Sequence, residues 1–384
     1  MSHSSLLCLL ILALLLPPPA QNAQSQSTQS PSAPSQNAQP PAFDDPSYRK
    51  FDQFLNFFRD RTAKEYSIDT TNGIQESSFV SIGGIDQWVT IRGTDRNNPV
   101  LLFVHGGPGD ATSAWSLPYF RAWEKHFTVV QWDQRGAGKT FGKSGPSIAP
   151  TMTLDRMTQD GLELTEYLRK HLNKPKIILV AHSFGTILAL RIVQQKPELF
   201  LAYVGTGEVA DETTNYAAAY EALLQHARST NNQEALDDLK TIGPPPYANF
   251  KGYQTQRKWS NRFEHADLFL PGTVSLALQN PGYTVRDLND TLDGEVFSAD
   301  QLVPQTKSAT MKDLGLHFAV PMFFFEGAED FSTPTGLAHK YLDTLDAPQK
   351  AFVPIPGGHF AVFIHSDDFL AALLSHILPL APAH

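Results

Sequence analysis

The chain has 384 residues, of which 41% are hydrophobic and 18% are charged, and its formal net charge at pH 7 is −9. A chain of this size and composition buries a large core, and one α/β domain with an insertion is the expected organisation. The sequence contains no dense block of Lys and Arg, which argues against binding to nucleic acid and against polybasic attachment to a membrane.

The first 46 residues have the composition of a targeting segment followed by a tether. The apolar run from Leu6 to Leu16 has the length of a signal-peptide core and is short for a membrane span. We therefore predict a signal peptide over residues 1–23 and export to the periplasm or the extracellular space. No Lys or Arg precedes the run and no clear cleavage site follows it, so an uncleaved anchor or a wrongly assigned start is the alternative. Residues 24–46, rich in Ser, Gln, Ala and Pro, are predicted to be a disordered tether.

Cys8 is the only cysteine of the chain and lies inside the apolar run. A mature chain that lacks it can form no disulfide and offers no thiol for catalysis or for binding a metal.

From about residue 47 the sequence has the pattern of a folded domain. Aromatic residues between Phe51 and Phe58 predict an amphipathic helix, and two β-like runs joined through Gly83 and Gly84 predict a hairpin. Continuous apolar runs separated by helix-like stretches indicate buried parallel strands in βαβ units, so we predict a mostly parallel, doubly wound sheet. The runs in question are Val100 to Val104, Phe127 to Trp132, Lys176 to Ala181 and Leu201 to Val204, with a helix-like stretch over 154–172.

An irregular and mostly helical segment over residues 210–316 interrupts this pattern. It contains two groups of helix-breaking residues, at 243–246 and at Pro271-Gly272. We predict that the segment is a helical cap over the ends of the strands.

The strand pattern returns after the cap, at residues 320–325 and 351–355, and a last helix is predicted over 367–378. The predicted α/β catalytic domain therefore consists of residues 47–209 and 317–384.

A candidate nucleophile lies at the end of one predicted strand, in the sequence Ala181-His182-Ser183-Phe184-Gly185. A helix is predicted directly after it, over 186–195. A serine at a sharp strand-to-helix turn, with small residues two before and two after it, is the nucleophile elbow of serine hydrolases. Ala181 departs from the glycine that is usual there, but its methyl group is small enough to fit. The alternative is an ordinary buried serine at a strand end.

A glycine-rich turn, His105-Gly106-Gly107-Pro108-Gly109, follows the strand that ends at Val104. Its glycines allow backbone N–H groups to face a reacting carbonyl. We predict an oxyanion hole formed by the N–H groups of Gly107 and Phe184. The alternative, a tight turn without a catalytic role, does not explain why the turn and the elbow occur in the correct order.

The predicted acid and base follow the last two strands. Asp330 comes just after one of them and His359 just after the next, and the chain order Ser, Asp, His is the order of this fold. His359 would take the proton of Ser183 and return it to the leaving group, while Asp330 would orient the imidazole. Glu326 and Glu329 are rival acids, of which Glu326 falls too early in the chain.

These motifs resemble the α/β-hydrolase superfamily and, within it, the prolyl aminopeptidase (proline iminopeptidase) group. The sequence from Asp133 to Thr140 is similar to that group's D-Q-R-G-x-G-x-S signature, and the resemblance extends in motif order from Gly83 to His359. It implies the α/β-hydrolase fold, with the cap inserted between the strand after the nucleophile helix and the strand that carries the acid. It also implies that the Asp133 loop is structural; a phosphate-binding loop would need a glycine where Asp133 stands. Epoxide hydrolases and dehalogenases of this superfamily carry an aspartate where Ser183 stands, so the resemblance does not extend to them.

The resemblance implies an acidic substrate site, because prolyl aminopeptidases hold the α-ammonium of the substrate with carboxylates of the cap. Glu208, Asp211 and Glu212 are acids at the start of this cap, and Gly106, Glu208 and Glu212 are our candidate substrate-binding residues. Six apolar cap residues would line a pocket or form the core of the cap itself: Phe250, Tyr253, Trp259, Phe263, Leu268 and Phe269.

Three functions follow from these observations. The first is an exopeptidase that releases N-terminal proline, or a similar residue, from short peptides. The second is a carboxylesterase that uses the same triad on small or lipid-like esters. The third, a non-catalytic module that binds a small ligand, would be favoured if a triad residue were missing. Neither enzyme requires a metal or an organic cofactor.

Overall fold

A computed structural model of the chain describes residues 46–247, 250–306 and 309–381. The predicted signal peptide and almost all of the predicted tether lie outside the described residues. The chain divides into two compact units, residues 1–55 and 56–384, and the second unit carries the sheet, the cap and the candidate site. Helix α2 (Pro46–Glu65) includes the predicted aromatic helix and crosses the boundary between the units. Among the described residues, no helix has both the length and the apolar character that crossing a membrane requires.

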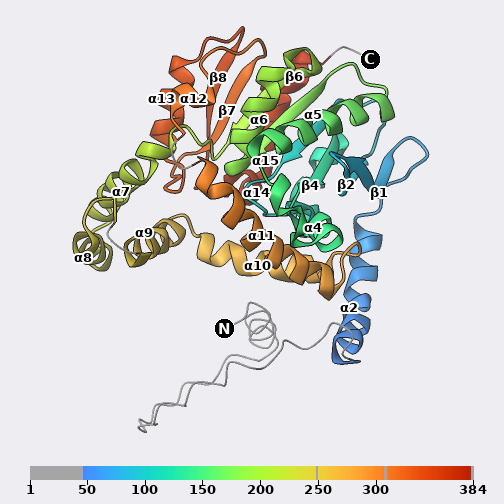
Figure 1. The fold of residues 1–384 in the computed structure, drawn as a ribbon, viewed down its shortest axis with the longest axis horizontal. Coiled ribbons are helices and arrows are strands. Elements are labelled where there is room, and N and C mark those ends of the chain that lie inside the picture. Colours follow the sequence, from blue (N-terminus) through green and yellow to red (C-terminus); the bar gives the residue numbers. More distant parts are fainter. Residues whose placement is uncertain (1–45, 248–249, 307–308, 382–384) are drawn as a thin grey trace. The chain divides into compact units, whose positions relative to one another are not determined.

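An eight-stranded sheet forms the centre of the second unit (Figure 1). Its strands lie in the order β1-β2-β4-β3-β5-β6-β7-β8, in which β2 is antiparallel to β1 and to β4 and all other neighbours are parallel. After β3 the chain places β4 on one side of it and β5 to β8 on the other side. The predicted doubly wound, mostly parallel sheet is therefore confirmed. The strand bounds are β1 (Ile74–Ile82), β2 (Ile85–Gly93), β3 (Val100–Val104), β4 (Thr128–Asp133), β5 (Ile177–His182), β6 (Phe200–Thr206), β7 (Met322–Gly327) and β8 (Lys350–Ile355).

The predicted hairpin is formed by β1 and β2, which pair from Ile74 and Gly93 to Ile82 and Ile85. Gly83 and Gly84 form the two-residue turn, with φ angles of +58° and +78°. A turn with positive φ at both central residues matches the twist of the two strands and favours glycine.

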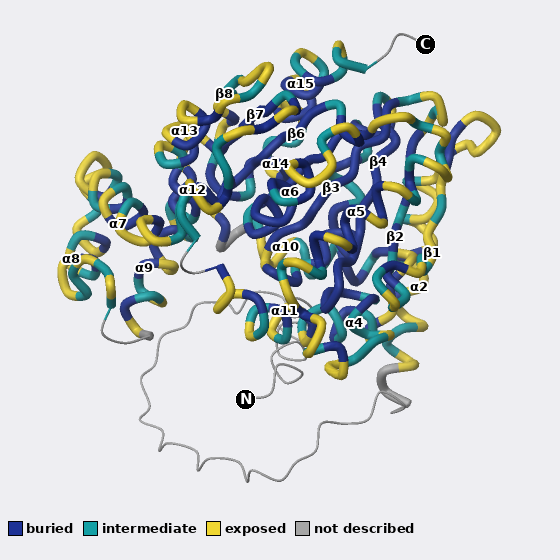
Figure 2. Tube along the Cα trace, turned by 45° about the horizontal axis from the view of Figure 1, so that its top comes forward, coloured by how far each residue is buried: buried dark blue, intermediate teal, exposed yellow. Residues whose placement is uncertain are grey.

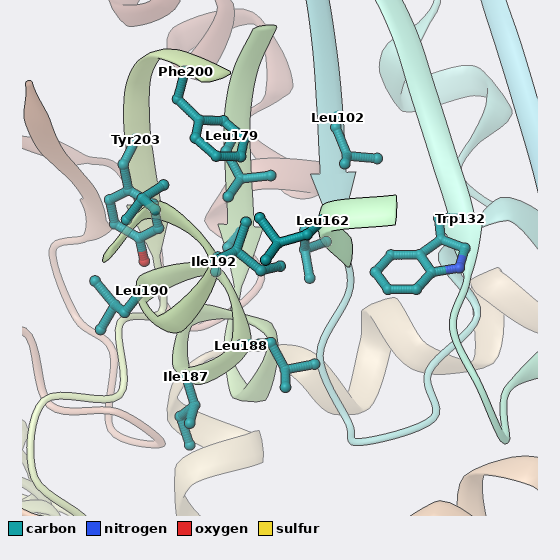
Figure 3. Close-up of a cluster of buried hydrophobic side chains, with 14 of the residues drawn as sticks. Leu102, Trp132, Leu162, Leu179, Ile187, Leu188, Leu190, Ile192, Phe200 and Tyr203 are labelled. Carbon is teal, nitrogen blue, oxygen red and sulfur yellow. The ribbon is translucent and has the colours of Figure 1, made fainter. Parts of the chain in front are cut away.

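Helices cover both faces of the sheet because successive side chains of a strand point to opposite faces. Leu102 and Leu179 pack into a cluster with residues of α5 and α6, several of which Figure 3 shows. Phe103 points the other way, with its ring centroid 5.0 Å from that of Phe120 and 5.9 Å from that of Phe363. The first face carries α5 (Leu154–His171), α6 (Phe184–Gln195) and α13 (Thr335–Thr344), and the second carries α3 (Leu117–Phe120), α14 (Ala361–Ile364) and α15 (Ser366–Ala372).

The predicted last helix over 367–378 is less regular than expected. Helix α15 ends at Ala372, a π-helical turn follows over Leu373–Ile377, and a 3-10 turn ends the region at Leu380. The wider π turn places Leu373 and Ile377 in the core, and both are fully buried. Proline at position 379 has no N–H to continue a helix.

In the part of the cap that the structure describes, six helices lie between β6 and β7: α7 (Glu212–Ser229), α8 (Gln233–Ile242), α9 (Phe250–Phe263), α10 (Ala266–Gln279), α11 (Val285–Thr306) and α12 (Met311–Leu314). The predicted break at 243–246 separates α8 from α9. The predicted break at Pro271 is wrong, because α10 continues through this residue. A proline removes one backbone donor, and tertiary packing of the rest of the helix can outweigh that loss.

The cap packs in two different ways. Helices α7, α8 and α9 enclose a small core, which includes Leu239, Trp259 and also Phe331 from the loop after β7, while their outer sides are exposed (Figure 2). Helix α11 lies instead against the loops of the catalytic domain. A Cβ atom on Gly294 of α11 would lie 2.7 Å from the carbonyl oxygen of Gly136, so this contact requires a glycine.

Candidate active site

Ser183 lies at the turn between β5 and α6 with φ +55° and ψ −131°, a conformation that non-glycine residues rarely adopt. Its N–H donates to the carbonyl oxygen of Thr206 at 3.0 Å. A side chain at position 185 would overlap the end of the neighbouring strand β3, since a Cβ atom on Gly185 would lie 2.5 Å from the oxygen of His105, the residue after β3. Ala181 is fully buried and its methyl group fits. The local geometry is that of a nucleophile elbow.

The structure brings Ser183, His359 and Asp330 into one hydrogen-bonded chain. Nε2 of His359 is 3.0 Å from Oγ of Ser183, and Nδ1 of His359 is 2.8 Å from Oδ2 of Asp330. His359 and Asp330 are buried, at 8% and 3% exposure, while Ser183 is partly exposed. Ser183 is therefore the most exposed residue of the three, and the two groups that would activate it are shielded from water.

The loop after β7 holds the carboxylate of Asp330 in place. Its Oδ1 accepts hydrogen bonds from the N–H groups of Ser332 at 2.8 Å and Thr333 at 2.7 Å. The Thr333 hydroxyl donates to Oδ2 at 2.9 Å. Three donors from the following turn leave Oδ2 oriented toward the imidazole, so the tautomer with a proton on Nδ1 is favoured.

The pKa of His359 is raised above its ordinary value of 6.5. Burial is the largest influence and lowers this pKa, but the charge of Asp330, its hydrogen bond and the charge of Glu264 together outweigh burial. The imidazole is therefore a stronger base than a free histidine.

His182 supports the backbone of His359. Its Nε2 lies 2.9 Å from the carbonyl oxygen of His359 and must donate to it. Burial is the main reason why the pKa of His182 falls to about 3, so this ring is neutral at pH 7. Its ring centroid is 4.8 Å from that of His359.

The glycine-rich turn, part of the predicted oxyanion hole, lies beside Ser183 at Gly106. A Cβ atom on Gly106 would lie 2.7 Å from Cβ of Ser183 and 3.4 Å from the backbone nitrogen of Phe184, so the bare glycine allows this approach. Gly107 has φ +107°, which favours glycine. Phe184 is the first residue of α6, where an N–H group has no acceptor within the helix. Gly106, a candidate substrate-binding residue, thus lies at the site.

The Asp133 loop braces the glycine-rich turn, as the resemblance implied. The side-chain amide of Gln134 donates to the carbonyl oxygen of His105 at 2.8 Å. Asp133 accepts from the N–H of Lys139 at 2.9 Å and from the hydroxyl of Ser113. These contacts connect β4 to the turn without involving Ser183.

The two rival acids lie away from the imidazole. Glu329 is exposed. Glu326 is fully buried, and its oxygens accept from the N–H of Glu208 at 3.2 and 3.3 Å. Burial and the nearby Glu208 raise the pKa of Glu326 well above its ordinary value.

Glu208 does not occupy the predicted position in a cap pocket. It is 1% exposed and its carboxyl group accepts from the hydroxyl of Tyr203 at 2.6 Å. Burial raises its pKa to about 8, so the group is protonated at neutral pH. The space for this buried side chain is provided by Gly205, where a Cβ atom would overlap the carboxyl group of Glu208.

Glu212 is the first residue of α7 and is partly buried. Burial and the charge of Asp211 raise its pKa. In the part of the chain that the structure describes, its side chain forms no hydrogen bond with the triad, so its predicted role in substrate binding stays a prediction.

Phe269 is the apolar cap candidate that lies near the site. Its ring centroid is 5.2 Å from that of Phe360 and 5.8 Å from that of Trp115. Trp259 and Phe263 instead belong to the core of the cap. Tyr253 packs against Tyr216 and Tyr247, and the side chains of Phe250 and Leu268 lie outside the described residues.

Two functional candidates escaped the sequence reasoning. Asp110, next to the glycine-rich turn, has its pKa raised to about 7 by burial and by the charge of Glu295 from α11. Glu264, between α9 and α10, is 5% exposed and bonds to the loops of both Asp330 and His359. An acid in a helical segment without a motif carries no sequence signal. Within residues 46–247, 250–306 and 309–381, no three His, Cys, Asp or Glu side chains are grouped to hold a metal ion.

A sheet of this topology with an elbow after β5 defines the class of α/β hydrolases. Residues 99–366 match the family model for the alpha/beta hydrolase fold, and the chain belongs to this family.

Similar proteins support the resemblance seen in the motifs. A Bacillus subtilis (strain 168) protein named "Probable aminopeptidase YbaC" is 30% identical over 300 residues, which cover 77% of this chain and 94% of the relative. A Streptomyces coelicolor protein named "Probable proline iminopeptidase" is 27% identical, over 65% of this chain and 79% of the relative. The crystal structure of a proline iminopeptidase-related protein from Thermus thermophilus has a TM-score of 0.51 at 20% identity, over 80% of this chain and 100% of that one. The last likeness concerns the fold.

Proposed function

We propose that this α/β hydrolase is a serine hydrolase that works by acyl transfer through Ser183, His359 and Asp330. The observation that carries the proposal is the hydrogen-bonded chain from Asp330 Oδ2 to His359 to Ser183 Oγ, with steps of 2.8 and 3.0 Å. Both distances suit proton transfer to the imidazole and its orientation by the carboxylate.

The reaction has two halves. Ser183 Oγ attacks the substrate carbonyl while its proton moves to Nε2 of His359, and the N–H groups of Gly107 and Phe184 stabilise the oxyanion. The imidazolium then protonates the leaving group, which departs from the acyl-enzyme. Water loses a proton to His359, attacks the acyl carbonyl and releases the acid together with Ser183.

The substrate class that we propose is a short peptide with a free N-terminus, cleaved after its first residue, proline or a similar one. Asp110 and Glu295 bring negative charge to the edge of the site, and Asp110 is close enough to His359 for their charges to interact. A substrate ammonium group would neutralise this charge. The Bacillus subtilis relative, whose match covers most of both chains, is named as an aminopeptidase, which supports the same substrate class.

The test compares the full chain with its Ser183→Ala variant on two substrates, a proline arylamide and a short-chain aryl ester. We expect faster turnover of the arylamide, loss of this activity when the proline nitrogen is acylated, and a fall of about 10⁵-fold in kcat in the variant. Undiminished activity of the variant would refute the nucleophile.

The same assay separates the alternatives. Ester turnover with an inert arylamide would make the protein a carboxylesterase that carries a peptidase-like motif. Inactivity of the folded protein on both substrates would favour the non-catalytic binding module.

A further inference from the structure

Glu264 connects the helical cap to both catalytic loops. Its Oε1 accepts from the N–H of Phe331 at 2.8 Å and from the hydroxyl of Ser332 at 3.2 Å. Its Oε2 accepts from the N–H of His359 at 3.0 Å. One oxygen thus binds the loop that carries Asp330, and the other binds the loop that carries the base.

The carboxylate of Glu264 accepts hydrogen bonds from backbone N–H groups at two positions, one next to a residue of the proposed triad and one within it. Phe331 directly follows Asp330, and the third donor is the N–H of His359 itself. The carbonyl oxygen of His359 is held from the other side by His182 at 2.9 Å. The peptide groups on both sides of the imidazole are therefore fixed, one by the cap and one by the residue that precedes the nucleophile.

Two features of the surrounding backbone allow and support this contact. Gly358 has no side chain where a Cβ atom would lie 2.5 Å from Cγ of Glu264 and 2.7 Å from its Cβ. On the cap side, the N–H of Glu264 donates to the carbonyl oxygen of Ser260 at 2.9 Å, which continues the last turn of α9. The carboxylate therefore has a rigid support and a matching space in the loop that it binds.

The pKa of Glu264 is raised to about 7, because burial and the charge of Asp330 outweigh the charge of His359 and the backbone donors, which lower it. The ionised form has acceptors for all three donors. Its negative charge also helps to raise the pKa of His359.

We infer that Glu264 is a positioning residue, a cap carboxylate that aligns the loops of Asp330 and His359 for catalysis. The inference rests on the proposed triad. According to this inference, the active site is assembled only when the turn between α9 and α10 packs against these two loops. This holds for any substrate. The competing role is direct binding of the substrate's ammonium group, which would matter only for substrates that have one.

The experiment measures kcat and KM of the full-chain wild type, Glu264→Gln and Ser183→Ala on an uncharged aryl ester and on a proline arylamide. Glutamine has the shape of the carboxylate but places an NH₂ group against one of the donors. We expect kcat to fall about ten- to hundredfold on both substrates, with KM changed less than about threefold. Glu329→Gln is the matched control, since it removes an exposed charge from the same loop as Asp330.

The pH profile of kcat/KM is the second readout, because loss of a merely structural residue would not shift it. The titratable or charged groups around His359 are Asp330, Glu264, Arg257, Asp110 and His182. Loss of the negative charge of Glu264 lowers the pKa of His359, so the acid limb of kcat/KM for the ester should shift to lower pH. The limb of Glu329→Gln should stay in place.

Two results would overturn the inference while the proposed function stands, provided that Ser183→Ala is inactive. One is wild-type kcat of Glu264→Gln on the ester. The other is a KM increase confined to the arylamide, which would make Glu264 an ammonium ligand. An active Ser183→Ala variant would instead refute the proposed function and the inference together.

If Glu264→Gln does not fold, Glu264→Asp replaces it. This variant keeps the charge but is too short to reach both loops. We expect a severalfold lower kcat on both substrates with an unchanged acid limb, and wild-type kcat would count against the positioning role.

Discussion

The strand-end loops of the catalytic domain and the helical cap build the site in different ways. The strand-end loops carry recognisable sequence motifs, with a positive φ at Ser183 and a glycine at position 185, where a side chain would overlap the end of β3. The cap has no such motif, and Glu264 contributes only because α9 ends against two loops that are distant in sequence. Local geometry therefore defines the reacting groups, and long-range packing defines how they are held.

The largest effect after loss of the nucleophile is expected for Asp330→Asn. We expect kcat to fall by about 10³- to 10⁴-fold, because the amide stabilises neither the imidazolium nor the tautomer with a proton on Nδ1. In the wild type the raised pKa of His359 places the acid limb of kcat/KM above pH 6.5, with activity rising as the ring loses its proton. The variant should shift this limb to lower pH. A pH series of initial rates on the ester measures both, and an unchanged rate would refute Asp330 as the acid.

Gly185→Ala tests the strand-end loops directly. The new methyl group would lie 2.5 Å from the His105 oxygen, so we expect a loss of about 2–4 kcal/mol in the free energy of unfolding. The matched control is Gly336→Ala in α13, where a Cβ atom meets nothing within 4 Å and the change should stay within about 1 kcal/mol. Urea unfolding compares the two. Equal stabilities would show that the elbow tolerates a larger residue.

Leu239→Ala tests the cap and should have the smallest effect on activity. The side chain is fully buried in the core of α7, α8 and α9, so its truncation should cost about 2–5 kcal/mol of local stability. Phe331 belongs to the same core and directly follows Asp330, so some loss of activity is expected. The fall in kcat on the ester should be no more than about tenfold. Hydrogen exchange should accelerate in the cap amides and not in the central strands. Acceleration throughout the sheet would show that cap and sheet unfold as one unit.

The sequence by itself determined most of the sheet and the residues of the proposed triad. Continuous apolar runs identify buried strands whatever their partners, and β3 begins and ends at the predicted residues. Ser183, Asp330 and His359 were readable because each lies within four residues after the end of a strand, and parallel strands bring their carboxyl ends to one edge of the sheet. The glycines of the turn at 105–109 were readable as a turn after a strand, although the close approaches that require them, of Gly106 to Ser183 and of Gly109 to Glu295, join segments far apart in the chain.

Tertiary structure alone decided the roles of the acids. Glu208 and Glu264 look alike in the sequence, yet one is a protonated carboxyl group against Tyr203 and the other bonds to both catalytic loops. Pro271 marked a break that the packed helix α10 does not have. The physical reason is common to these cases: burial, a carboxyl pKa and helix continuity depend on contacts between segments far apart in the chain, which no local pattern records.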